Sequence, residues 1–119
     1  MRFFAAIVKV AREAGQLPMG LLGFLFGGST KKIREFADRG AVILDVRSKA
    51  EYEGGAIPGA KHIPIEAVAG KVAEIKKWDR PIITCCESGV RSARAAALLR
   101  SKGVRAINGG GWASLYKKL

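Results

Sequence analysis

The apolar positions of this chain fall into short continuous runs separated by segments with helical periodicity. Apolar runs of strand length lie at residues 41–44 and 81–85, and shorter strand-like segments lie at 61–63 and 104–107. A run that is apolar throughout is typical of a strand covered on both faces, as in a parallel sheet. The pattern therefore predicts strands that alternate with helices in an α/β domain.

Helices are predicted beside and between these strands. The first begins at Ser29 or Thr30, either of which can cap it, and ends at Gly40. The others are expected at residues 49–53, 66–77 and 92–102. Gly70 weakens the third helix by about 1 kcal/mol relative to Ala. The crossovers between parallel strands are expected to be right-handed. In sheets of this kind, ligands bind beyond the carboxyl ends of the strands.

Residues 1–28 stand apart from this pattern and form a predicted N-terminal extension to a domain at 29–119. Residues 2–17 mix charged and apolar side chains in a way compatible with a basic amphipathic helix. The apolar run at 19–26 is far shorter than the ~18 to 20 residues of a membrane span. Lys9 and Pro18 interrupt the apolar centre that a secretory signal needs. The favoured interpretation is that the extension packs on the domain's own sheet or on a second subunit; the alternative is that it contacts a membrane surface peripherally.

The charge balance favours anionic partners. The chain has 119 residues, room for one domain, with 21 Lys and Arg against 10 Asp and Glu and a net charge of +11. Such an excess attracts small oxyanions, acidic proteins, anionic lipid or nucleic acid. The basic doublets are spread along the chain, however, which favours a solvated surface. No aromatic residues interleave with Arg in the predicted strands, so specific nucleic-acid binding is not expected.

The two cysteines, Cys85 and Cys86, are adjacent at the end of a predicted strand. Neighbouring strand residues point to opposite faces, so a disulfide between them would be strained. We interpret both as free thiols in a reducing compartment, which predicts a cytoplasmic location. With His62 as the single histidine, the chain lacks the spaced ligands of a structural zinc site.

The segment 86–92, called here the Cys86 loop, joins that strand to an alanine-rich helix. Its backbone N–H groups and the helix dipole converge on one place and favour an anion there. A cysteine at a helix N-terminus has a pKa of roughly 3.5–7.5, against about 8.5 for a free thiol. Cys86 is therefore a predicted nucleophile.

Five motifs occur together in a fixed order between residues 41 and 112. They are Asp45-Val46-Arg47 followed by Glu51-Tyr52; Gly55-Ala56-Ile57-Pro58-Gly59-Ala60; His62-Ile63-Pro64; the Cys86 loop; and Asn108-Gly109-Gly110 followed by Trp112. In this order and spacing the chain resembles a single-domain rhodanese. The resemblance implies a three-layer α/β/α fold around a mostly parallel sheet of four or five strands.

The resemblance further implies a sulfurtransferase. In this family the loop cysteine, here Cys86, takes sulfane sulfur from a donor such as thiosulfate and holds it as a persulfide. The outer sulfur then passes to a thiophilic acceptor such as cyanide, a cellular thiol or an acceptor protein. The backbone amides of the loop would hold the charge; they belong to Glu87, Ser88, Gly89, Val90, Arg91 and Ser92. Neither a metal nor an organic cofactor is expected.

Two other interpretations stay open. Cys85 and Arg91 have the Cys-x5-Arg spacing of cysteine-dependent phosphatases, but a Gly three residues after the nucleophile is found only when counting from Cys86. Cys85 is then a small buried residue at a strand end or a resolving thiol. Alternatively, the fold is a non-catalytic docking or persulfide-carrier module.

Two positions depart from the family pattern. Ala56 stands where the family usually has histidine, for which we expect a structural consequence. Glu87 places a carboxylate at the mouth of an anion site, which disfavours thiosulfate.

The remaining polar residues are assigned mainly supporting roles. Asp45 is expected to accept loop N–H groups, pair with Arg91 or cap its strand end, while Arg47 and Glu51 are expected to form an ion pair. His62 is predicted to be packed or hydrogen-bonded. Arg91 is expected to orient the loop in preference to contacting substrate, and Trp112 to anchor the core.

Overall fold

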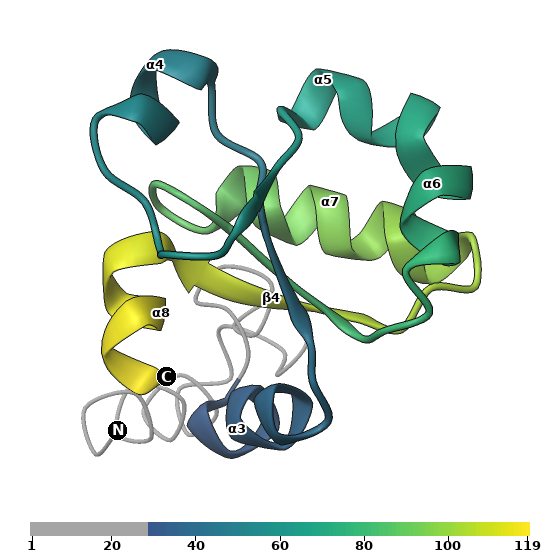
Figure 1. The fold of residues 1–119 in the computed structure, drawn as a ribbon, viewed down its shortest axis with the longest axis horizontal. Coiled ribbons are helices and arrows are strands. Elements are labelled where there is room, and N and C mark those ends of the chain that lie inside the picture. The colour runs from purple at the N-terminus through teal and green to yellow at the C-terminus, as the bar shows by residue number, and fades with distance from the viewer. Residues whose placement is uncertain (1–28) are drawn as a thin grey trace, which may run out of the picture.

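The computed structural model describes residues 29–119, which form a layered α/β domain (Figure 1). The strands are β1 Val42–Asp45, β2 Lys61–His62, β3 Ile82–Cys86 and β4 Ala106–Gly111. The helices are α3 Thr30–Asp38, α4 Lys49–Glu53, α5 Ile65–Val68, the 3-10 turn η1 Ala69–Lys71, α6 Val72–Lys77, α7 Val90–Ser101 and α8 Trp112–Lys118. The predictions for residues 1–28 lie outside the described residues.

The four described strands form one all-parallel sheet in the order β2-β1-β3-β4. The predicted α/β class with a parallel sheet is thus confirmed. In the register of β1 with β3, Asp45 lies opposite Cys85. The last residues of β1 and β3, Asp45 and Cys86, therefore lie at the same edge of the sheet.

Helices cover both faces of the sheet and create two apolar cores. Val68 of α5, Ile75 of α6 and Leu99 of α7 pack on one face, together with Ile82 and Cys86 of β3. The other core holds Ile33 and Phe36 of α3, Leu115 of α8, and Ile83 and Cys85 of β3. Successive residues of β3 thus alternate between the two cores, as the pleat of a strand requires. The result is the expected three-layer arrangement.

Most element boundaries lie within two residues of the sequence prediction, but three larger differences occur. The helix predicted at 66–77 is divided into α5, η1 and α6, with Gly70, a residue of low α-helix propensity, in the 3-10 turn. Strand β4 extends to Gly111 because it pairs with β3 as far as Cys86. Helix α8 was not predicted, since it is short and follows a glycine run.

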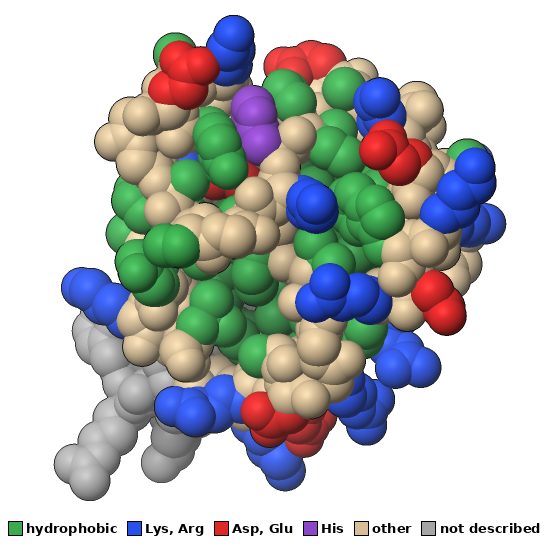
Figure 2. Space-filling model, viewed as in Figure 1, with side chains coloured by type: hydrophobic (Ala, Val, Ile, Leu, Met, Phe, Trp, Pro, Cys, Tyr) green, Lys and Arg blue, Asp and Glu red, His purple; other side chains and the backbone are tan. Residues whose placement is uncertain are grey.

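The face of the domain seen in Figure 2 carries both apolar and charged side chains. Lys and Arg side chains are distributed around it and do not gather into a single patch (Figure 2). Within residues 29–119, none of the helices combines the length and apolar character needed to span a membrane.

Candidate active site

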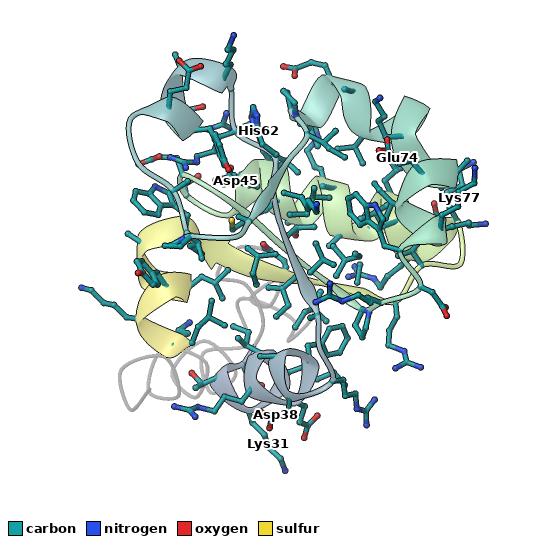
Figure 3. The ribbon with its side chains drawn as sticks, viewed as in Figure 1. Lys31, Asp38, Asp45, His62, Glu74 and Lys77 are labelled. Carbon is teal, nitrogen blue, oxygen red and sulfur yellow. The ribbon has the colours of Figure 1, made fainter. Side chains whose placement is uncertain are left out.

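Cys86 occupies the end of β3, where the chain turns into α7. Its side chain is fully buried, whereas Glu87 and Ser88 next to it are exposed. Gly89 has a φ of 101°, a value that L side chains rarely adopt, and so the turn that opens α7 favours glycine here. The nearby Asp45 and His62 lie at the carboxyl end of the sheet, remote from Lys31 and Asp38 of α3 (Figure 3).

Three hydrogen-bond donors surround the sulfur of Cys86. The backbone N–H of Gly89 lies 3.0 Å from Sγ, that of Ser92 3.4 Å, and the Ser92 hydroxyl 3.3 Å. Burial by itself raises the pKa of the Cys86 thiol. Hydrogen bonds from the Ser92 side chain, from the N–H of Ser92 and from that of Gly89 together lower the pKa by more than burial raises it, so the net shift is downward. The geometry thus favours a thiolate.

Strands β3 and β4 hold the far side of the loop through Thr84 and Asn108. The Thr84 hydroxyl donates to the carbonyl oxygen of Ser92 at 2.7 Å. Asn108 Oδ1 accepts from the Ser92 hydroxyl at 2.7 Å, and Asn108 Nδ2 donates to the Gly89 carbonyl at 3.0 Å. Asn108 was not predicted as a site residue, although it belongs to the Asn-Gly-Gly motif on which the resemblance rests.

The glycines after Asn108 permit this close approach of β4. A Cβ at Gly111 would stand 2.8 Å from the carbonyl oxygen of Glu87. Gly110 has a φ of 86°, and its N–H donates to Asn108 Oδ1 at 2.9 Å. Small residues are therefore required behind the Cys86 loop.

Asp45 and Arg47 form a buried ion pair beside the loop. The guanidinium donates to both carboxylate oxygens at 2.7–3.0 Å, and the N–H of Arg47 also donates to Asp45 Oδ1 at 3.0 Å. The predicted strand-end cap by Asp45 is confirmed, but the expected pairing with Arg91 is wrong. Hydrogen bonding to Asp45 raises the pKa of Arg47.

Arg47 also joins the segments that follow β1. Its Nη2 donates to the carbonyl oxygen of Gly55 at 2.7 Å, and its Nη1 to that of Glu51 at 3.2 Å. The guanidinium carbon of Arg47 lies over the Trp112 ring, 4.7 Å from the ring centroid. This is a cation–π arrangement. Trp112 is half-buried against the core that contains Leu115, in agreement with a packing role.

The predicted ion pair between Arg47 and Glu51 is wrong. The Glu51 carboxylate instead receives two hydrogen bonds from Arg91, at 2.7 and 3.0 Å. Helical spacing suggested a local pair, but burial of Arg47 directs its guanidinium to Asp45. The hydrogen bonds from Arg91 and the cap with Ser48 lower the pKa of Glu51 to about 2. Arg91 thus ties the start of α7 to α4.

Glu87 lies near the same cluster with its side chain 59% exposed. Its Oε2 is 3.4 Å from Arg47 Nη1, a guanidinium already engaged by Asp45. Around the Cys86 loop there are thus three carboxylates against two guanidiniums. These five side chains together carry a net negative charge, although the chain as a whole is strongly positive.

Cys85 points into the opposite core and is fully buried. Burial, followed by the charge of Asp45, raises the pKa of its thiol. A neutral buried thiol is a poor nucleophile, which argues against the phosphatase interpretation and favours the packing role for Cys85.

His62 is packed and hydrogen-bonded, as predicted. Its Nε2 lies 2.8 Å from the carbonyl oxygen of Arg47, and its ring stacks on Tyr52 with 4.4 Å between centroids. Because a carbonyl only accepts, Nε2 carries the proton. Ala56, the other departure in this region, is half-buried in the segment between α4 and β2; its structural consequence stays a prediction.

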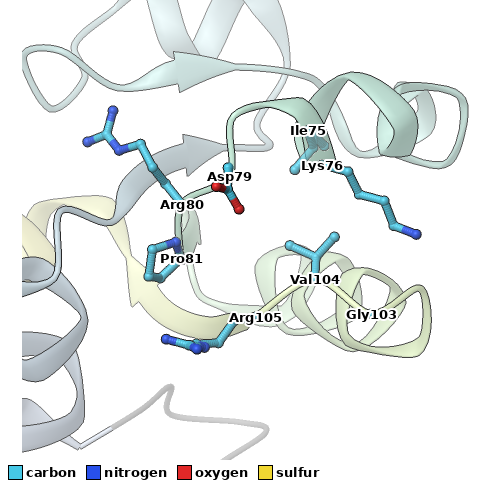
Figure 4. A pocket seen from close by; sticks show the side chains of 8 residues that line it. All are labelled: Ile75, Lys76, Asp79, Arg80, Pro81, Gly103, Val104 and Arg105. Carbon is cyan, nitrogen blue, oxygen red and sulfur yellow. The ribbon is translucent and has the colours of Figure 1, made fainter.

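A hollow near Arg80 lies at the other end of the sheet, beside the start of β3, and is separate from Cys86. In Figure 4 the cationic ends of Lys76, Arg80 and Arg105 point in different directions around it. Three cations that do not converge make a poor anion site.

The fold and this loop define a class of protein. The family described as the rhodanese-like domain matches residues 29–116, and the chain belongs to this family. The resemblance found in the sequence is thereby confirmed.

Individual relatives agree with this assignment. The uncharacterized protein YqhL of Bacillus subtilis is 42% identical over 69 residues, which cover 58% of this chain and 54% of YqhL. The thiosulfate sulfurtransferase GlpE of Pseudomonas aeruginosa is 31% identical over 91 residues, covering 72% and 82%. A rhodanese-like domain protein from Staphylococcus aureus has a TM-score of 0.61 at 28% identity, covering 73% of this chain and 86% of that one. The chain spans less than two thirds of the length of several curated relatives, YqhL among them.

Proposed function

We propose that Cys86 carries sulfane sulfur as a persulfide, from a small donor such as thiosulfate to a thiophilic acceptor such as cyanide, a cellular thiol or an acceptor protein. The observation that carries this proposal is the set of donors on the sulfur. Gly89 and Ser92 aim two backbone N–H groups and a hydroxyl at Sγ. The two backbone N–H groups are preorganised to stabilise an anion at this position.

The reaction consists of two displacements at sulfur. The Cys86 thiolate attacks the outer sulfur of thiosulfate, a new S–S bond forms, and the old S–S bond breaks, so that its electron pair leaves with sulfite. The acceptor then attacks the outer sulfur of the persulfide and releases the Cys86 thiolate. Covalent capture divides one transfer into two easier steps, and no external oxidant or reductant is consumed.

The relative GlpE is named a thiosulfate sulfurtransferase, which supports this donor class. The charges around the loop favour a donor of lower charge than thiosulfate, because Glu87 is exposed at the mouth. The persulfide chemistry is the same for both classes of donor. Glu87 therefore bears on the choice of donor, whereas Cys86 and its hydrogen-bond donors bear on the reaction.

The test is the mass of the intact protein after incubation with thiosulfate and then with cyanide. We expect a gain of one sulfur atom that is lost on adding cyanide. Cys86→Ser should abolish the gain, and the matched variant Cys85→Ser should retain it. No sulfur loading by thiosulfate or by a less charged thiosulfonate, or loading that depends on Cys85, would refute the proposal.

A further inference from the structure

The side-chain amide of Asn108 is held in one orientation behind the Cys86 loop. Its Oδ1 accepts from the N–H of Gly110 at 2.9 Å, and its Nδ2 donates to the carbonyl oxygen of Gly89 at 3.0 Å. A backbone N–H only donates and a carbonyl only accepts, so the reverse orientation of the amide would break both bonds. The oxygen of Asn108 therefore faces Ser92.

The hydroxyl of Ser92 lies between that oxygen and the sulfur of Cys86. Its Oγ is 2.7 Å from Asn108 Oδ1 and 3.3 Å from Cys86 Sγ. A hydroxyl has a single proton and donates it to one acceptor at a time. Ser92 is 0% and Asn108 7% exposed, so bulk water cannot readily replace the bond that is given up. Two acceptors thus share one proton.

We propose that Asn108 is a positioning residue that competes with Cys86 for the Ser92 proton and thereby limits how firmly the loop holds the sulfur as an anion. The proposal rests on the function of Cys86 proposed above. In the thiol form, the S–H of Cys86 donates to Ser92 Oγ and Ser92 donates to Asn108. In the thiolate form, Ser92 turns its proton to the sulfur and its bond to Asn108 breaks.

Sulfur loading reverses the direction of the Ser92 proton. In the persulfide the negative charge moves to the outer sulfur, and the inner sulfur of Cys86 becomes a weak acceptor. The Ser92 proton then returns to Asn108, the stronger acceptor. The competition also has a chemical use, because a thiolate that is stabilised too strongly is a poorer nucleophile. Asn108 keeps the sulfur ionisable without making it unreactive.

Other ionisable groups lie around the Cys86 loop, and apart from Cys85, which is replaced by serine in the test, they are the same in every variant of Asn108 and Ser92. Arg91 of the loop and Cys85 of β3 interact electrostatically with Cys86. Glu87 of the loop and the ion pair of Asp45 with Arg47 lie beside them. A difference between such variants therefore reports on the shared proton and not on these groups.

The test is the rate of alkylation of Cys86 by iodoacetamide as a function of pH, in the full chain with Cys85→Ser. Asn108→Leu removes the competing acceptor, so the pKa of Cys86 should fall and the thiolate fraction below that pKa should rise about 3- to 10-fold, the effect of one neutral hydrogen bond. Ser92→Ala should raise the pKa of Cys86. Adding Asn108→Leu to Ser92→Ala should produce no further change.

Asn108→Ala removes the same acceptor without filling its space, and it covers the case in which the leucine does not fold. A rise in the pKa of Cys86 in either Asn108 variant would overturn the proposal. So would an Asn108 effect that persists in Ser92→Ala, or a Ser92→Ala variant with an unchanged pKa. Alkylation requires no sulfur donor, so this result is independent of whether thiosulfate loads Cys86.

Discussion

The two charged side chains of the Cys86 loop have different partners. Arg91 is neutralised by two hydrogen bonds to Glu51. Among the described residues, Glu87 forms its ion pair with Arg47 at 3.4 Å, a guanidinium that already binds Asp45, and its charge also acts on Arg91, which Glu51 holds. The negative charge of Glu87 is therefore only partly compensated, and it stands where a dianionic donor must approach.

We predict that Glu87→Gln raises kcat/KM for thiosulfate by about 3- to 10-fold at low salt, because it removes the repulsion between an exposed carboxylate and a dianion. The gain should be smaller for methanethiosulfonate, which delivers the same kind of sulfur with one negative charge. Glu74→Gln on α6 is the control, since that side chain is similarly exposed at 56%. Equal gains for both donors would show that charge at this position does not select the donor.

At the scale of elements, the site depends on how closely β4 packs against β3. Gly109 lies on β4, immediately after Asn108. A Cβ there would meet Ile83 Cγ2 at 2.7 Å, Leu115 Cδ2 at 2.8 Å and the carbonyl oxygen of Thr84 at 2.8 Å. Two of these contacts belong to the β3 strand that carries Cys86. Strand separation and the position of the loop are thus coupled.

Gly109→Ala is expected to lower the free energy of unfolding by about 1–3 kcal/mol, the usual cost of overpacking a core. Gly70→Ala is the matched control, because nothing lies within 4 Å of a Cβ at Gly70 and its φ is not in the left-handed region. That variant should be neutral or up to about 1 kcal/mol more stable. Urea denaturation of both variants measures the difference. A Gly109→Ala variant as stable as the original chain would contradict this account of the packing.

At the scale of the whole molecule, the charge of the chain and the charge of the site are opposed. The net charge is +11, whereas carboxylates outnumber guanidiniums around the Cys86 loop. Residues 1–28 add basic and apolar side chains outside the family match at 29–116. We propose that this segment provides an attachment to an anionic surface and takes no part in the sulfur chemistry.

The full chain is accordingly expected to co-sediment with vesicles that contain anionic lipid, and to be released by salt. A chain of residues 29–119 should lose this association while its persulfide loading stays within about twofold of the full chain. Circular dichroism of the shortened chain serves as the folding control. Loss of loading in a folded shortened chain would show that residues 1–28 contribute to the site instead.

The order of elements was predictable, and Cys86 could be proposed as the nucleophile, because both inferences depend on local sequence. Apolar runs, caps and glycines determine where strands and helices begin and end, and Cys86 is marked by its place between β3 and α7. Helix α8 and the full extent of β4 were not predictable. Pairing with β3 extends β4 through a glycine run that has low strand propensity by itself.

The partners of the site's polar side chains were decided by the tertiary structure alone. Spacing in the sequence favoured Arg47 with Glu51, but the parallel register and burial of Arg47 bring it to Asp45 and leave Glu51 to Arg91, 40 residues away. Asn108 reaches Ser92 only because β4 lies beside β3. Local sequence thus determined which group is the proposed nucleophile, whereas long-range packing determined which groups donate hydrogen bonds to it, because hydrogen-bond partners depend on distance in space and not along the chain.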